Sequence, residues 1–469
     1  MTRWMLLLHR YMGIALGVLM VMWCLSGVVM MYVSYPALAE SVRLKQLTPI
    51  AWDGCCKVPD QLRDDARPAG RAEIEMLAGG PVLFLDPERS VPIDLRTGSA
   101  ISGISPAQAA QVAKNFLAAS NPATAPRLLG LIDHDQWTVS GDFHSSRPLY
   151  RFALEDSAGT QVYISSVTGR AVQFTTAHER FWNWLGAVPH WLYFTELRRH
   201  AWLWSQVVIY ASLLGCFLTV IGIYLGVRQM AVQPSGRWSP YVGFNLWHHI
   251  AGLVFGVFTL TWVASGLLSM NPWGWLEAES AQAENARIHG GETSTADLAR
   301  ALQKIADARP EAVSLQSAAL NGRLFFVART SGGERRRFDD AGSPALLGGA
   351  DLAFLSNAAQ GANASLELLQ QEDNYYFSHH REVAALPVYR LVLASGTRYY
   401  FDSVSGMLVA KQDSQARAFR WLHAGLHRLD FAASLRSRPL WDVLMLVLMA
   451  GVTVGCVTGA YLGYRRLTR

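Results

Sequence analysis

Histidine is the residue type in this chain best suited to bind a metal, and four of the thirteen histidines occupy matching places. His9 and His248 begin two long apolar segments, and His190 and His427 come shortly before two others. An ionisable residue in or beside a membrane segment is costly and is a functional candidate by default. A neutral imidazole is the commonest protein ligand for metals, haem iron included. For one isolated histidine, an interfacial residue at a helix end is the simpler interpretation.

Glycines follow His9 and His248 at helical spacing. Each histidine is followed, at steps of four, by two glycines, which are Gly13, Gly17, Gly252 and Gly256. Residues four apart lie on one face of a helix. Small residues there let a flat macrocycle approach the backbone, or let another helix pack closely, as in GxxxG motifs. The two roles can coexist.

Haem suits these histidines better than zinc does. No cysteine or carboxylate joins them in the tetrahedral set that a structural zinc site uses. Single histidines from two helices suit the two axial positions of a haem iron. Six arginines near the segment ends could pair with haem propionates, although membrane anchoring or interfacial solvation explains any single one. They are Arg10, Arg228, Arg465, Arg198, Arg199 and Arg436.

Long apolar segments must position these residues. Hydrophobic residues make up 51% of the chain and charged residues 16%, against about 25% charged residues in a soluble domain. This composition indicates a membrane protein with soluble parts. Because about 20 apolar residues cross a bilayer, the sequence predicts four spans. The first is too long for a signal peptide and is expected to be an uncleaved anchor.

The net charge of +5, without a Lys/Arg block, excludes nucleic acid as a partner. The basic residues instead predict orientation. Arginines flank the start of the first span, the loop between the second and third spans, and the end of the fourth. We therefore expect a bacterial inner-membrane protein with both termini cytoplasmic and two periplasmic domains. The flanking arginines are Arg3, Arg10, Arg228, Arg237, Arg465, Arg466 and Arg469.

The two halves of the chain resemble each other. LHRYMGIALGVLMVMWCLSG from Leu8 matches WHHIAGLVFGVFTLTWVASG from Trp247, and GIYLG from Gly222 matches GAYLG from Gly459. YISSVTG, which ends at Gly169, matches YFDSVSG, which ends at Gly406. The pattern predicts an internal duplication of a span–domain–span unit, with a pseudo-twofold axis along the membrane normal.

This axis strengthens the metal hypothesis. His9 and His248 share one register in two related helices, so they can face one metal on the axis from opposite sides. His190 and His427 form a second matched pair at the other membrane face. Two further histidines, His249 and His423, align with non-histidine residues, so symmetry disfavours them and leaves them as alternates.

The sequence predicts two small α+β domains outside the membrane. The segments Ser105–Ser120 and Ser294–Ala308 predict helices that begin at a serine N-cap. LYRFALEDSAGTQVYISS and VYRLVLASGTRYYFDS alternate apolar and polar residues and predict hairpins with a Gly-containing turn. Loop histidines in these domains could line a substrate or metal site, but solvated histidines are the simpler interpretation. They are His144, His379 and His380.

The five cysteines do not form a disulfide scaffold or a zinc frame, because there is no CxxC motif. They are Cys24, Cys55, Cys56, Cys216 and Cys456. Adjacent Cys55 and Cys56 could form a vicinal disulfide or a redox pair. Two unpaired neighbours are the favoured prediction.

The motifs quoted above resemble a known family. LHRYMGIALGVLMVMWCLSG and its copy are similar to the PepSY-associated transmembrane helix family, and VYISSVTGRAV and YYFDSVSGMLV are similar to PepSY domains. The resemblance covers nearly the whole chain. Characterised relatives include ferrisiderophore reductases and other iron-regulated inner-membrane proteins. The resemblance implies two b-type haems, with the ligand role at His9, His190, His248 and His427, and electrons carried to ferric iron outside the inner membrane.

Some relatives carry a C-terminal flavin and nicotinamide reductase domain. This sequence stops at Arg469 and has no G-x-G-x-x-G fingerprint between a strand and a helix. We expect no bound flavin or nicotinamide, and an external electron donor, either a quinol or a cytoplasmic reductase.

The resulting prediction is a four-helix membrane bundle with two extracytoplasmic α+β PepSY-like domains. The expected boundaries are a first span at 1–36, a first domain at 37–177, an interfacial segment with the second span at 178–228, a cytoplasmic loop at 229–243, a third span at 244–271, a second domain at 272–414, and an interfacial segment with the fourth span at 415–469. The predicted function is haem-based electron transfer to periplasmic Fe(III), expected to be a ferric siderophore. A non-catalytic protein that binds or restrains an exported peptidase and a transporter are the alternatives.

Overall fold

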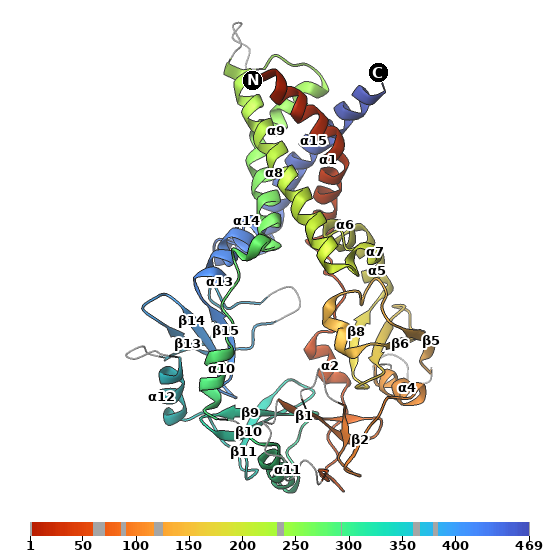
Figure 1. Cartoon of the computed structure of the whole chain (residues 1–469), viewed down its shortest axis with the longest axis vertical. Helices are drawn as coiled ribbons and strands as arrows, with labels where there is room; N and C mark the ends of the chain where they lie inside the picture. The colour runs from red at the N-terminus through yellow and green to blue at the C-terminus, as the bar shows by residue number, and fades with distance from the viewer. Residues whose placement is uncertain are drawn as a thin grey trace. The chain divides into compact units, whose positions relative to one another are not determined.

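The computed structural model describes most of the chain and is drawn in Figure 1. The described residues are 2–59, 71–85, 91–116, 125–231, 239–291, 293–359, 366–378 and 383–468. The chain divides into two compact units. The helical unit contains 1–35, 181–278 and 414–469, and the sheet unit contains 36–180 and 279–413.

Four long apolar helices form the core of the helical unit, and each is long and apolar enough to cross a membrane. They are α1 (Thr2–Met30), α8 (Ala201–Ala231), α9 (Phe244–Ser269) and α15 (Leu440–Leu467). The four predicted spans are thereby confirmed as an integral-membrane bundle. In a bilayer such helices are stable because every backbone polar group within the span is bonded inside its own helix.

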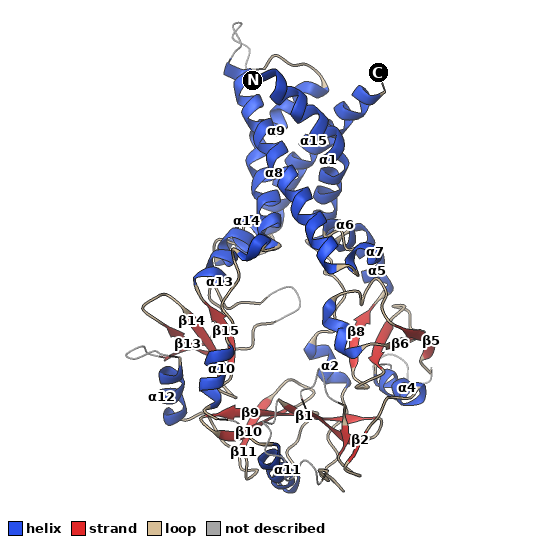
Figure 2. Cartoon of the chain, in the orientation of Figure 1, coloured by secondary structure: helices blue, strands red, loops and turns tan. Residues whose placement is uncertain are grey.

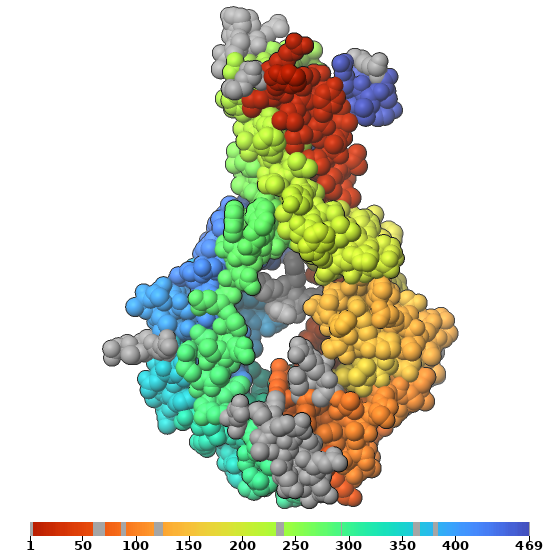
Figure 3. Space-filling model, viewed as in Figure 1, coloured from red at the N-terminus to blue at the C-terminus, as the bar shows by residue number. Residues whose placement is uncertain are grey.

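The four helices alternate in direction. The early residues of α1 and α9 lie beside late residues of α8 and α15, since His9 contacts Gly222 and His248 contacts Gly459. The helices approach closely at glycines: a Cβ atom at Gly17 would lie 3.3 Å from Ala460. Small residues at such crossings are typical of membrane helix packing. In the space-filling view, the red atoms of α1 lie directly against the yellow-green atoms of α8 (Figure 3).

Short helices precede α8 and α15 and carry the second pair of histidines. Before α8 come α5 (Ala177–Leu185), α6 (Ala187–His190) and α7 (Thr195–Arg198). Before α15 come α13 (Ser414–Phe419), a π-helical turn (Arg420–Gly425), α14 (Leu426–Arg428) and η4 (Ala433–Arg436), and η2 (Pro272–Gly274) follows α9. Helix α6 lies against α1, and Asn183 Nδ2 of α5 donates at 2.9 Å to the carbonyl of Ser34, which follows α1 in the chain.

In the described residues, the sheet unit contains three antiparallel sheets, and Figure 2 draws their strands in red. One four-stranded sheet contains β5 (Arg127–Ile132), β6 (Leu149–Ala153), β7 (Gln161–Ser165) and β8 (Ala171–Thr175), and α4 (Pro106–Asn115) packs on it. The other contains β12 (Leu366–Leu369), β13 (Val388–Val392), β14 (Arg398–Asp402) and β15 (Leu408–Gln412), with α10 (Gln282–His289) and α12 (Gly349–Ala358) in the same core.

A seven-stranded sheet joins the two chain segments of this unit. In spatial order it contains β11 (Arg335–Asp339), β10 (Arg323–Arg329), β9 (Ser314–Leu320), β1 (Ala72–Leu77), β2 (Gly80–Leu85), β3 (Ile93–Asp94) and β4 (Ser99–Ala100). The junction is the β1–β9 pair, in which Ile74 faces Leu315. Helix α11 (Thr295–Ala308) packs on this sheet, and α2 (Glu40–Gln46) contacts β1 through Arg43.

The predicted local elements outside the membrane are confirmed. The hairpins β6–β7 and β13–β14 are present, and their turns contain Gly159 and Gly396 with positive φ. Ser105 and Ser294 are N-caps with capping boxes. Helix α4 ends at Asn115, and the remainder of the predicted helix to Ser120 lies largely outside the described residues.

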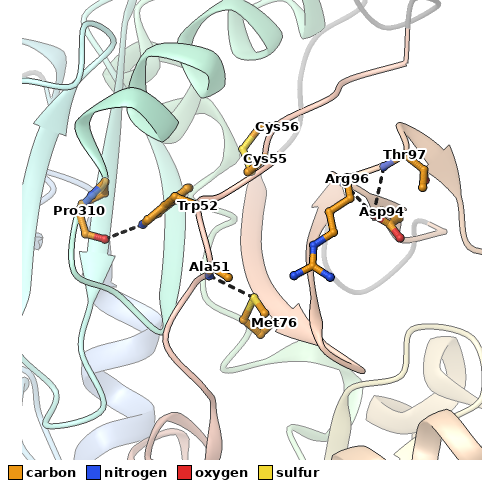
Figure 4. Close-up of a disulfide and its surroundings, with 9 residues drawn as sticks. All are labelled: Ala51, Trp52, Cys55, Cys56, Met76, Asp94, Arg96, Thr97 and Pro310. Carbon is orange, nitrogen blue, oxygen red and sulfur yellow. Dashed lines mark hydrogen bonds between the residues drawn. A yellow bond between two sulfur atoms is a disulfide. The ribbon is translucent and has the colours of Figure 1, made fainter.

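The prediction for the adjacent cysteines is wrong. Cys55 and Cys56 form a vicinal disulfide, which Figure 4 shows beside Trp52. The sequence offered no spacing pattern to distinguish this bond from two free thiols. The other three cysteines are free.

A buried carboxylate on β1 helps to hold the two segments of the sheet unit together. Glu73 accepts from Arg170 at 3.0 Å, from Arg329 at 2.9 Å and from Ser314 Oγ at 2.8 Å. Burial alone opposes ionisation, but Arg170, Arg43 and Arg329 outweigh it and lower the pKa of Glu73 to about 2. Arg329 and Ser314 belong to the second segment, so the carboxylate bridges the junction.

Replacing Glu73 with glutamine is expected to destabilise the sheet unit by about 3–5 kcal/mol, because removing one partner leaves buried charges uncompensated. Thermal unfolding followed by circular dichroism measures this loss. Since the pKa is lowered in the folded state, the stabilisation is present above the ordinary glutamate pKa and disappears as the pH falls toward 2. The exposed pair Glu155–Arg127 gives the control, and Glu155→Gln should cost less than about 1 kcal/mol. Equal losses for both variants would contradict the bridging role.

Candidate functional site

The structure places His9 of α1 and His248 of α9 face to face. Their ring centroids are 6.2 Å apart, and the ring planes are inclined by 40°. Residues far apart in the sequence therefore meet at the end of the bundle where α1 and α9 begin. We call them the inner pair.

Both imidazoles of the inner pair have the tautomer in which Nδ1 carries the proton, because each Nδ1 faces a backbone carbonyl oxygen. His9 Nδ1 lies 3.2 Å from the Leu218 carbonyl oxygen, and His248 Nδ1 lies 3.0 Å from the Gly455 carbonyl oxygen. A carbonyl oxygen only accepts, so each Nδ1 carries the proton and each Nε2 carries a free lone pair. Among the described residues, none forms a hydrogen bond with either Nε2. A hydrogen bond from one ring nitrogen to a carbonyl oxygen is the usual way in which a protein orients a histidine that binds a metal through the other nitrogen.

A cavity of about 480 Å³ surrounds the inner pair. Its volume falls within the roughly 300–1,000 Å³ typical of ligand and cofactor pockets. The four predicted glycines all line it, but in two ways. A Cβ atom at Gly13 or Gly252 would meet nothing within 4 Å, whereas Gly17 packs on Ala460 and Gly256 on Ile223. Both roles considered from the sequence are thus present, divided between the first and second glycine of each helix.

Two further glycines were missed by the sequence reasoning as site residues. A Cβ atom at Gly222 would lie 2.7 Å from Cε1 of His9, and one at Gly459 would lie 2.9 Å from Cε1 of His248. A larger residue at either position would displace the imidazole from the place that it occupies. The matching segments GIYLG and GAYLG contained this signal, because each begins with the glycine concerned.

His190 of α6 and His427 of α14 form the outer pair, at the opposite end of the helical unit. Their ring centroids are also 6.2 Å apart, with an interplanar angle of 75°. Burial lowers the pKa of His190 to about 4. Burial, together with the neighbouring His190 and His423, lowers the pKa of His427 to about 3. Both imidazoles are therefore neutral at pH 7, which is the form that binds metals.

Serines and backbone carbonyls orient the outer pair. His190 Nδ1 lies 3.1 Å from both the Trp23 carbonyl and Ser26 Oγ. His427 Nδ1 lies 2.9 Å from Ser265 Oγ. Each serine hydroxyl donates to a backbone carbonyl of its own helix, so it can accept from the imidazole. Ser26 and Ser265 occupy the same place in the two similar sequence segments, but they were not among the predicted site residues.

Replacing Ser265 with alanine removes the hydroxyl that accepts from His427 Nδ1. Loss of the hydrogen-bond partner of a metal-binding histidine typically weakens metal binding by about 10–100-fold. For the haem proposed below, we therefore expect dissociation from the outer pair to be about tenfold faster. Transfer of haem to an excess of apomyoglobin measures this rate. Ser212→Ala is the control, because Ser212 is a buried serine of α8 that is not a hydrogen-bond partner of any of the four histidines. Identical rates for the two variants would exclude an orienting role for Ser265.

The two alternate histidines, His249 and His423, differ in their hydrogen bonds. His249 has both ring nitrogens engaged, with Nδ1 2.7 Å from Ser239 Oγ and Nε2 2.9 Å from the Gly226 carbonyl. These contacts suit a structural residue. His423 Nδ1 lies 3.2 Å from the Ser265 carbonyl, and its ring centroid is 5.3 Å from that of His427. His423 therefore lies beside the outer pair.

Both pairs have the spacing that two axial ligands of one iron require. A metal–imidazole nitrogen bond of about 2 Å, plus about 1.1 Å from that nitrogen to the ring centre, separates two coaxial ring centroids by about 6.2 Å. Both observed separations equal this value. Rotation about the common axis changes the interplanar angle without changing this distance. The ring separation of each pair therefore matches that of two axial imidazoles on one iron, and the cavity provides room for a macrocycle at the inner pair. Among the described residues, no group of three or more His, Cys, Asp or Glu side chains forms a conventional metal cluster.

The arginines proposed for propionates are placed unevenly. Arg10 lines the inner cavity, and so does Arg466, which the sequence reasoning used only for orientation. Arg436 pairs with Asp430 at 2.8 Å, Arg199 pairs with Glu196 at 3.0 Å, and Arg198 stacks on Tyr193 and Trp204. Arg228 contacts Tyr224, and Arg465 lies over Tyr461.

The loop histidines contribute nothing to these sites. His144 is in the short helix Gly141–Ser146 of the sheet unit and is largely exposed. His379 and His380 lie outside the described residues.

Comparison with known proteins assigns the chain at the level of a family. The family model described as the PepSY-associated TM region matches residues 6–466. No curated protein matches the chain significantly.

Proposed function

We propose that this chain, which belongs to the PepSY-associated TM region family, is a membrane electron-transfer protein with two bound haem b groups. The observation that carries the proposal is the equal separation of two histidine pairs, 6.2 Å in each, at opposite ends of one four-helix bundle. Two sites at opposite membrane faces suit the passage of electrons across a bilayer.

The chain's own residues supply ligation, orientation and space. The four imidazoles present Nε2 as ligands, and their Nδ1 atoms are held by carbonyl or hydroxyl oxygens. Gly13 and Gly252 leave open space beside the inner pair, while Gly222 and Gly459 admit the rings themselves. Arg10 and Arg466, at the cavity wall, would neutralise propionates. Bound haem supplies reversible one-electron Fe(III)/Fe(II) chemistry.

Matched contacts support the idea that the bundle arose by internal duplication. In each half, a serine of the first helix faces the histidine that precedes the second, as Ser26 with His190 and Ser265 with His427. Each inner histidine likewise rests on a glycine late in the neighbouring helix. A pseudo-twofold axis through both pairs explains why one fold unit, used twice, makes two similar sites.

The proposed direction is outward from the cytoplasmic side of a bacterial inner membrane. The basic residues near His9 and His248 support a cytoplasmic position for the inner pair under the positive-inside rule. The donor is a quinol or a cytoplasmic reductase, and the acceptor is a periplasmic Fe(III) complex, specifically a ferric siderophore. The acceptor rests on the family resemblance rather than on any site geometry.

Anaerobic reoxidation tests the acceptor. The purified protein, reduced with dithionite and freed of excess reductant, is mixed with ferrioxamine or ferric citrate in the presence of a ferrous chelator. We expect the reduced haem bands to disappear while the ferrous chelate forms, one Fe(II) for each haem oxidised. Reduced haem that persists with every Fe(III) complex would remove the reductase proposal while leaving the haem sites in place. A peptidase-binding protein or a transporter would gain support only if no haem were bound at all.

A further inference from the structure

The vicinal disulfide lies in a segment that ties the two halves of the sheet unit together. We call residues 48–58 the clasp. Its Ile50 amide donates to the Ala312 carbonyl at 2.8 Å, and Trp52 Nε1 donates to the Pro310 carbonyl at 3.0 Å. Figure 4 shows Trp52 reaching from the clasp to Pro310, close to the two cysteines.

The clasp is also anchored to its own segment of the chain. The Lys57 amide donates to the Leu95 carbonyl at 2.7 Å. Between these anchors the chain turns at Trp52–Cys55, where Gly54 has a φ of +72° and the Cys55 amide donates to the Trp52 carbonyl at 3.1 Å. A residue other than glycine would be strained at that position. The clasp is therefore a defined turn held at both ends.

The two sulfurs differ in environment. Cys56 is 3% exposed and belongs to the core that includes Leu298 and Leu302 of α11. Cys55 is only partly buried against the same core and follows the exposed Asp53–Gly54 turn. Adjacent side chains on an extended backbone point to opposite faces. A bond between them holds both sulfurs on the side of the core.

The usual structural reason for a disulfide is absent here. A disulfide stabilises chiefly by closing a loop in the unfolded chain, and the gain grows with loop length. Cys55 and Cys56 are neighbours, so their bond closes no loop between distant residues. The bond does constrain the backbone at Cys55 and Cys56, which lies close in sequence to Trp52 and its hydrogen bond with the Pro310 carbonyl.

We propose that the Cys55–Cys56 disulfide is a thiol–disulfide exchange site whose reduction by a dithiol loosens the clasp between the two halves of the sheet unit. A thiolate of the dithiol attacks Cys55 Sγ, the accessible sulfur, and forms a mixed disulfide as the Cys55–Cys56 bond breaks. Cys56 leaves as a thiolate and takes a proton. The second thiol of the dithiol then attacks the sulfur that the dithiol contributes to the mixed disulfide. The dithiol thereby becomes a disulfide, and Cys55 is released as a thiol. Two electrons pass from the dithiol to the protein.

This site is independent of the haem proposal, because it lies wholly within the sheet unit. Its chemistry suits the oxidising compartment expected for residues 37–177, where a disulfide persists until a dedicated dithiol reduces it. The reduced clasp would let Cys55 turn toward water and weaken the packing of Trp52 in the core.

Cysteine labelling and hydrogen exchange on the full chain in detergent test the proposal. The protein is treated with dithiothreitol under native conditions, quenched at intervals with iodoacetamide, and digested for mass spectrometry. We expect Cys55 to be alkylated before Cys56, and amide exchange at Ile50 and Lys57 to accelerate by about tenfold or more on reduction. Labelling at Cys216, a free thiol in α8, should not change with reductant and serves as the control.

Two variants that cannot form the disulfide test the same proposal without a reductant. The double variant Cys55→Ser/Cys56→Ser and the single variant Cys55→Ser should both show the faster exchange without reductant and no further response to it. The proposal is overturned if the bond resists dithiothreitol in the folded protein, if Cys56 is labelled first, or if reduction leaves exchange at Ile50 and Lys57 unchanged.

Discussion

Replacing His248 with alanine is expected to leave the protein with one haem where the wild type binds two. His248 supplies one of two axial nitrogens at the inner pair, and its ring centroid lies 6.2 Å from that of His9. Without it, a haem at that site would have one protein ligand and would lose the cavity wall formed by the ring. The pyridine haemochrome assay should therefore fall to about half of the wild-type haem per chain.

The equivalent change at the outer pair should give the same stoichiometry by loss of the other haem. His427→Ala removes an imidazole that is oriented by Ser265. The double variant His248→Ala/His427→Ala should bind no haem. His144→Ala, at a largely exposed loop histidine, is the matched control and should keep two haems. Full haem content in both single variants would show that the histidine pairs are not the ligands.

Filling the inner cavity is expected to have an effect as large as removing a ligand. Gly13→Leu places a side chain where a Cβ atom meets nothing within 4 Å, in a cavity of about 480 Å³. The new side chain finds free space, so the bundle should fold, but a macrocycle can no longer approach the backbone of α1. We expect haem content to fall by about half, with the spectrum of the outer site retained.

The same experiment separates haem binding from helix packing. Val18→Leu lies on the same helix, at a position 76% exposed, and should keep both haems. If Gly13 served only helix packing, Gly13→Leu would lower thermal stability and leave the haem content per folded chain unchanged. A variant with two haems and wild-type spectra would refute the role assigned to this glycine.

The sequence was most informative where periodicity and internal similarity coincide. Apolar length predicted α1, α8, α9 and α15, because a bilayer leaves few other ways to bury such segments. The shared register of His9 with His248 and of His190 with His427 led to two pairs that the structure brings together. Helical spacing selected Gly13 and Gly252, which face the cavity.

Other features depend on tertiary contacts that no local pattern specifies. Gly222 and Gly459 matter because an imidazole from a different helix lies against them, and sequence spacing does not reveal which helices are neighbours. The β1–β9 junction joins residues far apart in the chain, so the alternation of either strand alone could not show it. The Cys55–Cys56 bond depends on the turn around Gly54 and on packing under α11. His249 could be assigned a structural role only after both of its partners were located.

The absorption spectrum of the purified wild-type protein, recorded with its haem content per chain, tests the central claim most directly. Expression should be carried out with ample haem, and the oxidised and dithionite-reduced states compared. The account predicts two b-type haems per chain, with the sharp reduced bands of low-spin iron that two axial imidazoles produce. A protein that folds and purifies under these conditions without a Soret band would contradict it.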